Sequence, residues 1–249
     1  CTKNGVNEIV EVKIGFDGIV LANSKKAERV ELSLKQLFLA LAKEVPVDGE
    51  LVPNPYEKWS DIDASLPNRR IEVLGPPPTS GTRDAFVEVA MEGGAKRIST
   101  LKALRNENKK EFERIAHSIR EDGAYVEAGE NDNLIIQKLV ANPSALGIFG
   151  FSFLDQNEDK IQGALVDEAE PTFDNIADGK YAIARSLYYY VKKAHVGKVP
   201  GLEEFLHEFT SDRASGEDGY LADRGLIPLP TDDRMTERKN AKALMPLQL

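Results

Sequence analysis

Short apolar runs typical of strands alternate with amphipathic runs typical of helices along most of this chain. The clearest helical stripe places Leu34, Leu37 and Phe38 on one face, directly after Ser33, whose side chain favours the N-cap position. The other candidate elements are strands over 71–74, 145–153, 161–166 and 181–192, and helices over 109–120, over 131–141 and from Pro200 onward. Such alternation predicts an α/β fold with mixed sheets flanked by helices.

Two regions are harder to assign. Apolar alternation over 8–14 and again over 19–21 surrounds Gly15 and Gly18, which predicts two strand pieces joined at a bend. The segment 47–70 is rich in proline and glycine, so we expect a long connection there with at most short elements.

Composition excludes several classes of protein. With 32 Lys and Arg against 41 Asp and Glu, the net charge is −9, and no basic run offers a nucleic acid a footprint. The longest apolar stretch, 37–42, is far shorter than the ~20 residues that a membrane span needs, so we expect a water-soluble chain. A single cysteine excludes an intrachain disulfide, and the three histidines lack the spacing of zinc motifs. We therefore expect no metal and no cofactor.

The sharpest local signal is Thr79-Ser80-Gly81-Thr82, which follows the strand at 71–74 and opens a helix. The start of a helix presents unpaired backbone N–H groups, and here two hydroxyls and a glycine could help it hold an oxyanion. A plain N-cap by Ser80 explains the same residues, and local sequence leaves both interpretations open. The lysine of a nucleotide-binding phosphate loop is missing, which disfavours a triphosphatase.

Arg120 is expected to close the helix over 109–120, where it is either a solvated cation at a helix C-terminus or a ligand residue. His117, three residues earlier, is expected on or beside the apolar face of that helix. Ser80 lacks the flanks of a G-x-S-x-G elbow and has no histidine nearby in sequence, so a serine hydrolase or phosphatase is only an alternative.

Seven segments in collinear order resemble one known family. They are Lys3-Asn4-Gly5-Val6, 16–23 (FDGIVLAN), 75–77 (GPP) leading into 80–86 (SGTRDAF), 119–123 (IREDG) before 130–133 (ENDN), 145–151 (ALGIFGF), 184–191 (ARSLYYYV) and 225–230 (GLIPLP). Together they resemble the phosphate-binding proteins of bacterial phosphate transporters, members of the two-lobed type II periplasmic binding protein superfamily.

This resemblance implies that residues 1–18 and 187–249 are the remaining part of lobe I, and that 19–186 form lobe II. It implies capture of inorganic phosphate between the lobes by Ser80, Gly81, Thr82 and Arg120, and delivery to the membrane permease of an ABC transporter. It implies no catalysis, a monomer, and a periplasmic or otherwise extracytoplasmic, membrane-associated location. Residues 76–79 lack the arginine that some relatives carry just before Ser-Gly-Thr.

The resemblance also implies an incomplete first lobe. Relatives carry a signal peptide and most of the front of lobe I before the stretch that matches Cys1, so Cys1 is interpreted as an interior cysteine, which in relatives can pair with one in the missing part. The lobe I ligands would lie in that part. A binding protein for another tetrahedral oxyanion, such as sulfate, therefore stays open.

Overall fold

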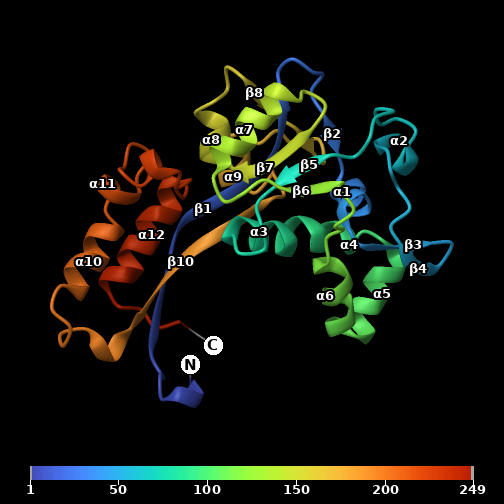
Figure 1. Cartoon of the computed structure of the whole chain (residues 1–249). Coiled ribbons are helices and arrows are strands. Elements are labelled where there is room, and N and C mark those ends of the chain that lie inside the picture. Colours follow the sequence, from blue (N-terminus) through green and yellow to red (C-terminus); the bar gives the residue numbers. More distant parts are fainter. Residues whose placement is uncertain (1, 248–249) are drawn as a thin grey trace. The chain divides into compact units, whose positions relative to one another are not determined.

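A computed structural model describes residues 2–247 (Figure 1). The expectations about Cys1 lie outside these residues. The chain divides into two compact units: unit 1 holds Cys1–Asp17, Ile176–Gly179 and Ala184–Leu249, and unit 2 holds Gly18–Asn175 and Lys180–Ile183. The assignment of 1–18 and 187–249 to one lobe and 19–186 to the other remains a prediction.

The main sheet of unit 2 is mixed. The second half of β1 (Ile9–Ser24) pairs antiparallel with β7 (Leu146–Gly150) and, at its end, with β8 (Ile161–Gly163). On the far side of β7, β5 (Val73–Gly75) and then β6 (Tyr125–Glu127) continue in parallel. The carboxyl ends of β5 and β6 therefore lie on the same side of the sheet, and their amino ends lie on the opposite side.

Helices and two small sheets complete unit 2. The helices are α1 (Leu34–Leu41), α2 (Trp59–Ile62), α3 (Gly81–Phe86), the π-helical turn η2 (Val87–Met91), α4 (Glu92–Ala95), α5 (Ser99–Glu107), α6 (Lys109–His117), α7 (Asp132–Ala141), α8 (Phe151–Asp155) and most of α9 (Phe173–Ala177). The small sheets pair β2 (Glu31–Leu32) with β9 (Leu165–Val166) and β3 (Glu44–Val47) with β4 (Glu50–Pro53).

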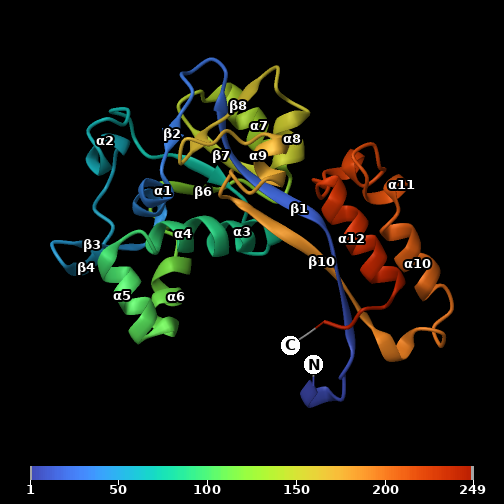
Figure 2. The same cartoon turned by 180° about the vertical axis from the view of Figure 1, so that it is seen from behind.

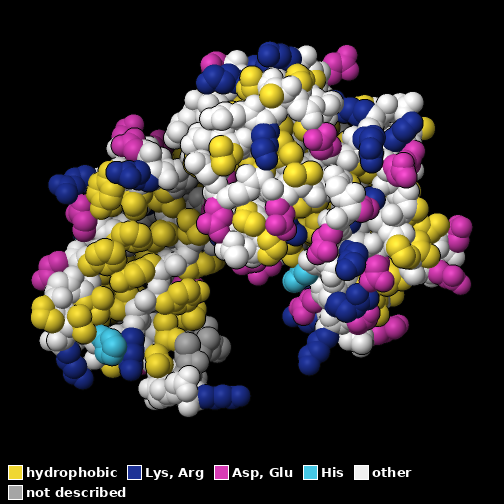
Figure 3. All heavy atoms as spheres, in the orientation of Figure 1, with side chains coloured by type: hydrophobic (Ala, Val, Ile, Leu, Met, Phe, Trp, Pro, Cys, Tyr) yellow, Lys and Arg dark blue, Asp and Glu magenta, His cyan; other side chains and the backbone are white. Residues whose placement is uncertain are grey.

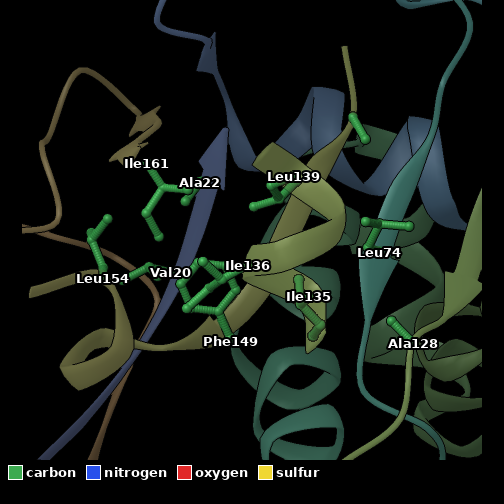
Figure 4. Close-up of a cluster of buried hydrophobic side chains, with 11 residues drawn as sticks. Val20, Ala22, Leu74, Ala128, Ile135, Ile136, Leu139, Phe149, Leu154 and Ile161 are labelled. Carbon is green, nitrogen blue, oxygen red and sulfur yellow. The ribbon is translucent and has the colours of Figure 1, made fainter. Parts of the chain in front are cut away.

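The core of unit 2 forms where α7 covers the sheet. Ile135 and Leu139 of α7 pack against Phe149 of β7 and Val20 of β1, all of them fully buried (Figure 4). A glycine at 147 lets α7 come close, because a Cβ there would stand 2.8 Å from side-chain atoms of Ile135 and Leu139. The predicted helix over 131–141 is confirmed, with Asn131 as its N-cap.

Unit 1 is built on the first half of β1 and on β10 (Ala184–Lys192), which lie side by side in both views (Figures 1 and 2). Its helices are α10 (Leu202–Phe209), α11 (Asp212–Ser215), α12 (Thr231–Lys242) and the short turns η1 (Thr2–Asn4), η3 (Lys193–His195) and η4 (Ala222–Arg224). Val10, Val12 and Val191 of the strands pack against Leu206 and Ala241.

Unit 1 leaves much apolar surface uncovered. Hydrophobic side chains gather over α10 to α12 in the space-filling view (Figure 3), and Tyr190, Phe205 and Met235 are each about half exposed or more. Phe205 also stacks on Phe209 at a centroid distance of 5.3 Å and contacts the tilted ring of Tyr189 at 5.5 Å. Tyr190, Phe205 and Met235 thus lie outside the buried core of unit 1.

Three expectations about elements are wrong. β1 runs unbroken through Gly15, because the glycine allows a close backbone approach: a Cβ there would stand 2.5 Å from the Ile227 carbonyl oxygen. The strand expected over 145–153 ends at Gly150, and the helix α8 follows it directly. The helix over 109–120 ends at His117, so Arg120 lies beyond it.

Candidate functional site

Ser80 begins a helical stretch at the carboxyl end of β5. Its extended backbone (φ −88°, ψ 133°) is that of an N-cap, and its Oγ accepts a hydrogen bond from the Thr82 N–H at 3.2 Å. The Ser80 N–H donates to the Pro77 carbonyl at 3.0 Å. The capping interpretation is thus confirmed, and it leaves the Ser80 O–H free to donate, because a hydroxyl accepts and donates at once.

The other groups at this helix start suit an anion. Of the first-turn N–H groups, those of Gly81 and Arg83 have no acceptor within the helix, as at any helix N-terminus. Gly81 is exposed, while Ser80 and Thr82 are half-buried. The structure therefore brings three of the four predicted site residues, Ser80, Gly81 and Thr82, together in one turn.

A hydrogen bond from Tyr125 stabilises the turn between β5 and this helix. The buried Tyr125 hydroxyl donates to the Pro76 carbonyl at 2.7 Å, and Arg83 Nη1 donates to the same oxygen at 3.3 Å. Gly75 is required here, because a Cβ on it would stand 2.2 Å from the Tyr125 oxygen. Further along, the exposed Thr79 hydroxyl donates to Glu130 at 2.6 Å.

Arg120, the fourth predicted residue, is not part of this turn. It comes five residues before β6, whereas Ser80 comes five residues after β5, and the two strands are parallel with Val73 opposite Tyr125. Arg120 therefore lies beyond the amino end of β6, whereas Ser80 lies beyond the carboxyl end of the neighbouring strand β5. The assignment of Arg120 as a phosphate ligand remains a prediction that this placement does not support.

The buried guanidinium of Arg120 is occupied by other groups. Its Nη1 donates to the carbonyl oxygens of Tyr56 (2.7 Å) and Ala40 (3.3 Å), and its Nε and Nη2 bind the Asp122 carboxylate at 2.5–2.9 Å. The hydrogen bond from Arg120 holds the pKa of Asp122 below its ordinary value, against the effect of partial burial. Arg120, which was expected to close its own helix, thus places its charge at the C-terminus of α1 instead.

Together with Asn54, Arg120 satisfies the last carbonyl groups of α1. Its backbone N–H donates to Leu41 O at 2.9 Å, and Asn54 Nδ2 donates to Leu39 O and Ala42 O, both at 2.7 Å. The four carbonyls from 39 to 42 therefore all have donors, and Arg120 places positive charge at the negative end of the helix dipole.

His117 is no base for Ser80. It is exposed, not packed on an apolar face as expected, and its Nε2 lies 2.8 Å from Glu92 Oε1. Burial of Glu92 works to raise its pKa, but hydrogen bonds from Lys96 and His117 outweigh it and leave that pKa lowered. Among residues 2–247, no three His, Cys, Asp or Glu side chains are grouped as a metal site requires. No helix in that range is long and apolar enough to cross a membrane.

Comparison with known proteins places the chain in a family. Residues 1–213 match the family model of the PBP superfamily domain. The chain belongs to this superfamily. Solved structures share its mixed α/β fold of two lobes: a possible phosphate binding protein from Planctomyces limnophilus (TM-score 0.68, 22% identity, 98% of this chain and 75% of that one) and PstS from Borrelia burgdorferi (TM-score 0.61, 17% identity, 93% and 76%).

Proteins similar to this chain in sequence are named as phosphate-binding proteins. The chain is 30% identical over 220 residues to the phosphate-binding protein PstS of Staphylococcus haemolyticus, covering 85% of this chain and 57% of that protein. It is 26% identical over 229 residues to PstS of Staphylococcus saprophyticus, covering 90% and 58%. The chain thus spans less than two thirds of the length of these relatives.

Sequence reasoning missed Tyr125 and Arg83. Arg83 follows the Ser-Gly-Thr segment directly, so its presence was visible, but nothing in a helical pattern shows that its side chain turns back to Pro76. Tyr125 is 49 residues from Pro76 along the chain. Only the parallel pairing of β5 and β6 brings its ring under the turn.

Proposed function

We propose that this chain is part of an extracytoplasmic solute-binding protein that captures inorganic phosphate reversibly and delivers it to the membrane permease of an ABC transporter. The similarity to PstS proteins supports phosphate as the ligand, and the observation that carries the proposal is the turn Ser80-Gly81-Thr82. Hydroxyls and free N–H groups meet there at one helix start, where oxyanions are favoured. The protein binds without catalysis and acts as a monomer.

The net charge of −9 does not oppose this function. At physiological salt the screening length is about 8 Å, so distant carboxylates are muted, while donors in contact with the anion act at short range. Phosphate is held by oriented dipoles at the site, and the surface charge sets only the long-range field.

The test is calorimetric titration of phosphate into the complete protein as its gene encodes it, because the chain spans only part of its relatives. Thr82→Val removes one hydroxyl at constant shape, and we expect phosphate binding to weaken by about 1–3 kcal/mol. Ser80→Ala should weaken binding similarly and also cost about 1 kcal/mol of stability through the lost cap. Thr100→Val, at an exposed position of α5, is the matched control.

Unchanged phosphate affinity in both Ser80→Ala and Thr82→Val would refute the site. Sulfate is titrated in parallel, because an anion site of this composition also suits other tetrahedral oxyanions. Binding of sulfate in preference to phosphate would replace the proposed ligand.

A further inference from the structure

Arg83 is placed beside the proposed anion site by two contacts. It lies on the first turn of α3, its Nη1 reaches back to the Pro76 carbonyl at 3.3 Å, and its guanidinium carbon stands 4.3 Å from the centre of the Tyr125 ring. A planar guanidinium over an aromatic face is held by cation–π attraction while its remaining N–H groups stay available.

Arg83 forms no ion pair within residues 2–247, in contrast to Arg120. Arg120 forms an ion pair with Asp122, but among residues 2–247 no carboxylate oxygen lies within 4.0 Å of the Arg83 guanidinium. Arg83 is also half-buried, so water compensates its charge only in part. A half-desolvated cation without a counter-ion attracts an anion more strongly than an exposed or paired one.

The Arg83 side chain lies between the turn before Ser80 and an acidic hollow. Arg83 lines a hollow of about 230 Å³ with Pro78, Asp84, Val87, Glu88 and His117, and the two carboxylates disfavour an anion in that hollow. The Arg83 guanidinium also reaches the turn, where its Nη1 donates to the Pro76 carbonyl, four residues before Ser80. Glu130, the carboxylate nearest to that turn by hydrogen bonding, is exposed and accepts from Thr79.

Tyr125 holds both the turn and the cation. Its hydroxyl and Arg83 Nη1 donate to one oxygen, that of Pro76, so movement of the tyrosine displaces both. Burial raises the pKa of Tyr125 to about 12, and the hydroxyl therefore stays protonated and able to donate across the physiological range. The ring also fills the space that opens above Gly75.

We propose that Arg83 supplies the positive charge that contacts phosphate at the Ser80–Thr82 turn, and that Tyr125 is the positioning residue that holds Arg83 there. This inference rests on the proposed function. It assigns to Arg83 the charge that sequence analysis assigned to Arg120.

The test compares phosphate affinities of the complete wild-type protein and of variants by calorimetry at two salt concentrations. Arg83→Gln should weaken binding about ten- to hundredfold, as expected for the loss of one hydrogen bond between charged groups, and should flatten the salt dependence. Arg83→Lys keeps the charge and should recover part of the loss. Arg105→Gln removes the same charge from an exposed position of α5 and should leave affinity unchanged.

Tyr125→Phe tests the positioning of Arg83 separately from the contact between Arg83 and phosphate. The ring and its stacking remain but the hydroxyl is lost, so we expect weaker binding with the salt dependence of wild type, since the charge is still present. Urea unfolding of each variant, followed by fluorescence of the buried Trp59, shows whether unit 2 is intact.

The outcomes are distinguishable. If wild type does not bind phosphate, the proposed function fails and the inference fails with it. If wild type binds phosphate and Arg83→Gln binds it equally well, only the inference fails. It also fails alone if Arg83→Gln and Arg83→Lys lose the same affinity and that loss only follows their loss of stability.

Discussion

Replacement of Arg120 by methionine decides between a structural and a ligand role for this arginine. Methionine keeps most of the length and volume of the side chain but removes every donor. The carbonyl oxygens of Tyr56 and Ala40 then lose their Arg120 donor in a buried region, and Asp122 loses its cation.

The expected loss of stability is set by the carbonyl groups. An unsatisfied buried acceptor costs about 1–3 kcal/mol, so two of them cost roughly 3 kcal/mol after some access of water. The pair with Asp122 adds little, because the Asp122 side chain is 53% exposed and such pairs contribute at most about 1 kcal/mol. For a unit of this size, about 3 kcal/mol corresponds to a decrease in Tm of roughly 6–12 °C.

Trp59 makes the measurement specific to unit 2. It is the only tryptophan in the sequence, is 2% exposed, and lies three residues after Tyr56. Urea unfolding followed by its fluorescence should show an earlier midpoint for Arg120→Met than for wild type, whereas Arg105→Met, at an exposed site, should unfold like wild type. Phosphate affinity is measured below the transition. An unchanged midpoint together with a tenfold or greater loss of affinity would refute the capping argument and restore Arg120 as a ligand.

Two further predictions concern the same unit. Gly94→Ala should destabilise the protein by about 1–3 kcal/mol in urea unfolding despite the better helix propensity of alanine, because a Cβ there would stand 2.1 Å from Leu34 O and 2.6 Å from Phe38 Cβ. Gly93→Ala is its control, since the new methyl would meet only the flexible end of Leu34, and equal losses in both variants would contradict the packing argument. For Asp122, a folded-state pKa below its ordinary 3.8 means that its contribution is present above that value and is lost as the pH falls through the lowered pKa. Asp122→Asn should therefore weaken the dependence of the unfolding midpoint on pH below about 4, and an unaltered acid profile would speak against the pair.

The fold class was predictable because it depends on local periodicity. Helix α1 illustrates this: its apolar stripe and its cap Ser33, which closes a capping box with Gln36, are both local features. The errors occurred where a distant segment decides the structure. From the sequence alone, Gly15 predicts a bend. In the structure the Ile227 carbonyl lies against Gly15 and Phe16 pairs with Ile227, so the glycine serves close packing within a continuous strand.

The candidate site divides in the same way. Ser80, Gly81 and Thr82 are adjacent in sequence, so a helix start was enough to group them. The role of Arg120 depends on Ala40 and Tyr56, which lie 80 and 64 residues away, and no local pattern contains that information. The end of α6 at His117 also removed the premise that Arg120 closes its own helix.

The contrast between Arg83 and Arg120 shows what makes an arginine available to a ligand. Both are at least half-buried and both donate to backbone carbonyls, so burial and hydrogen bonding do not separate them. Charge balance does: Asp122 neutralises Arg120, and an incoming anion would have to displace a bidentate carboxylate that already fits. Within the described residues, Arg83 has no paired carboxylate that an anion would have to displace. Because Arg83 forms no ion pair within residues 2–247 and follows Ser80, Gly81 and Thr82 directly, we expect its charge rather than that of Arg120 to be available to a phosphate.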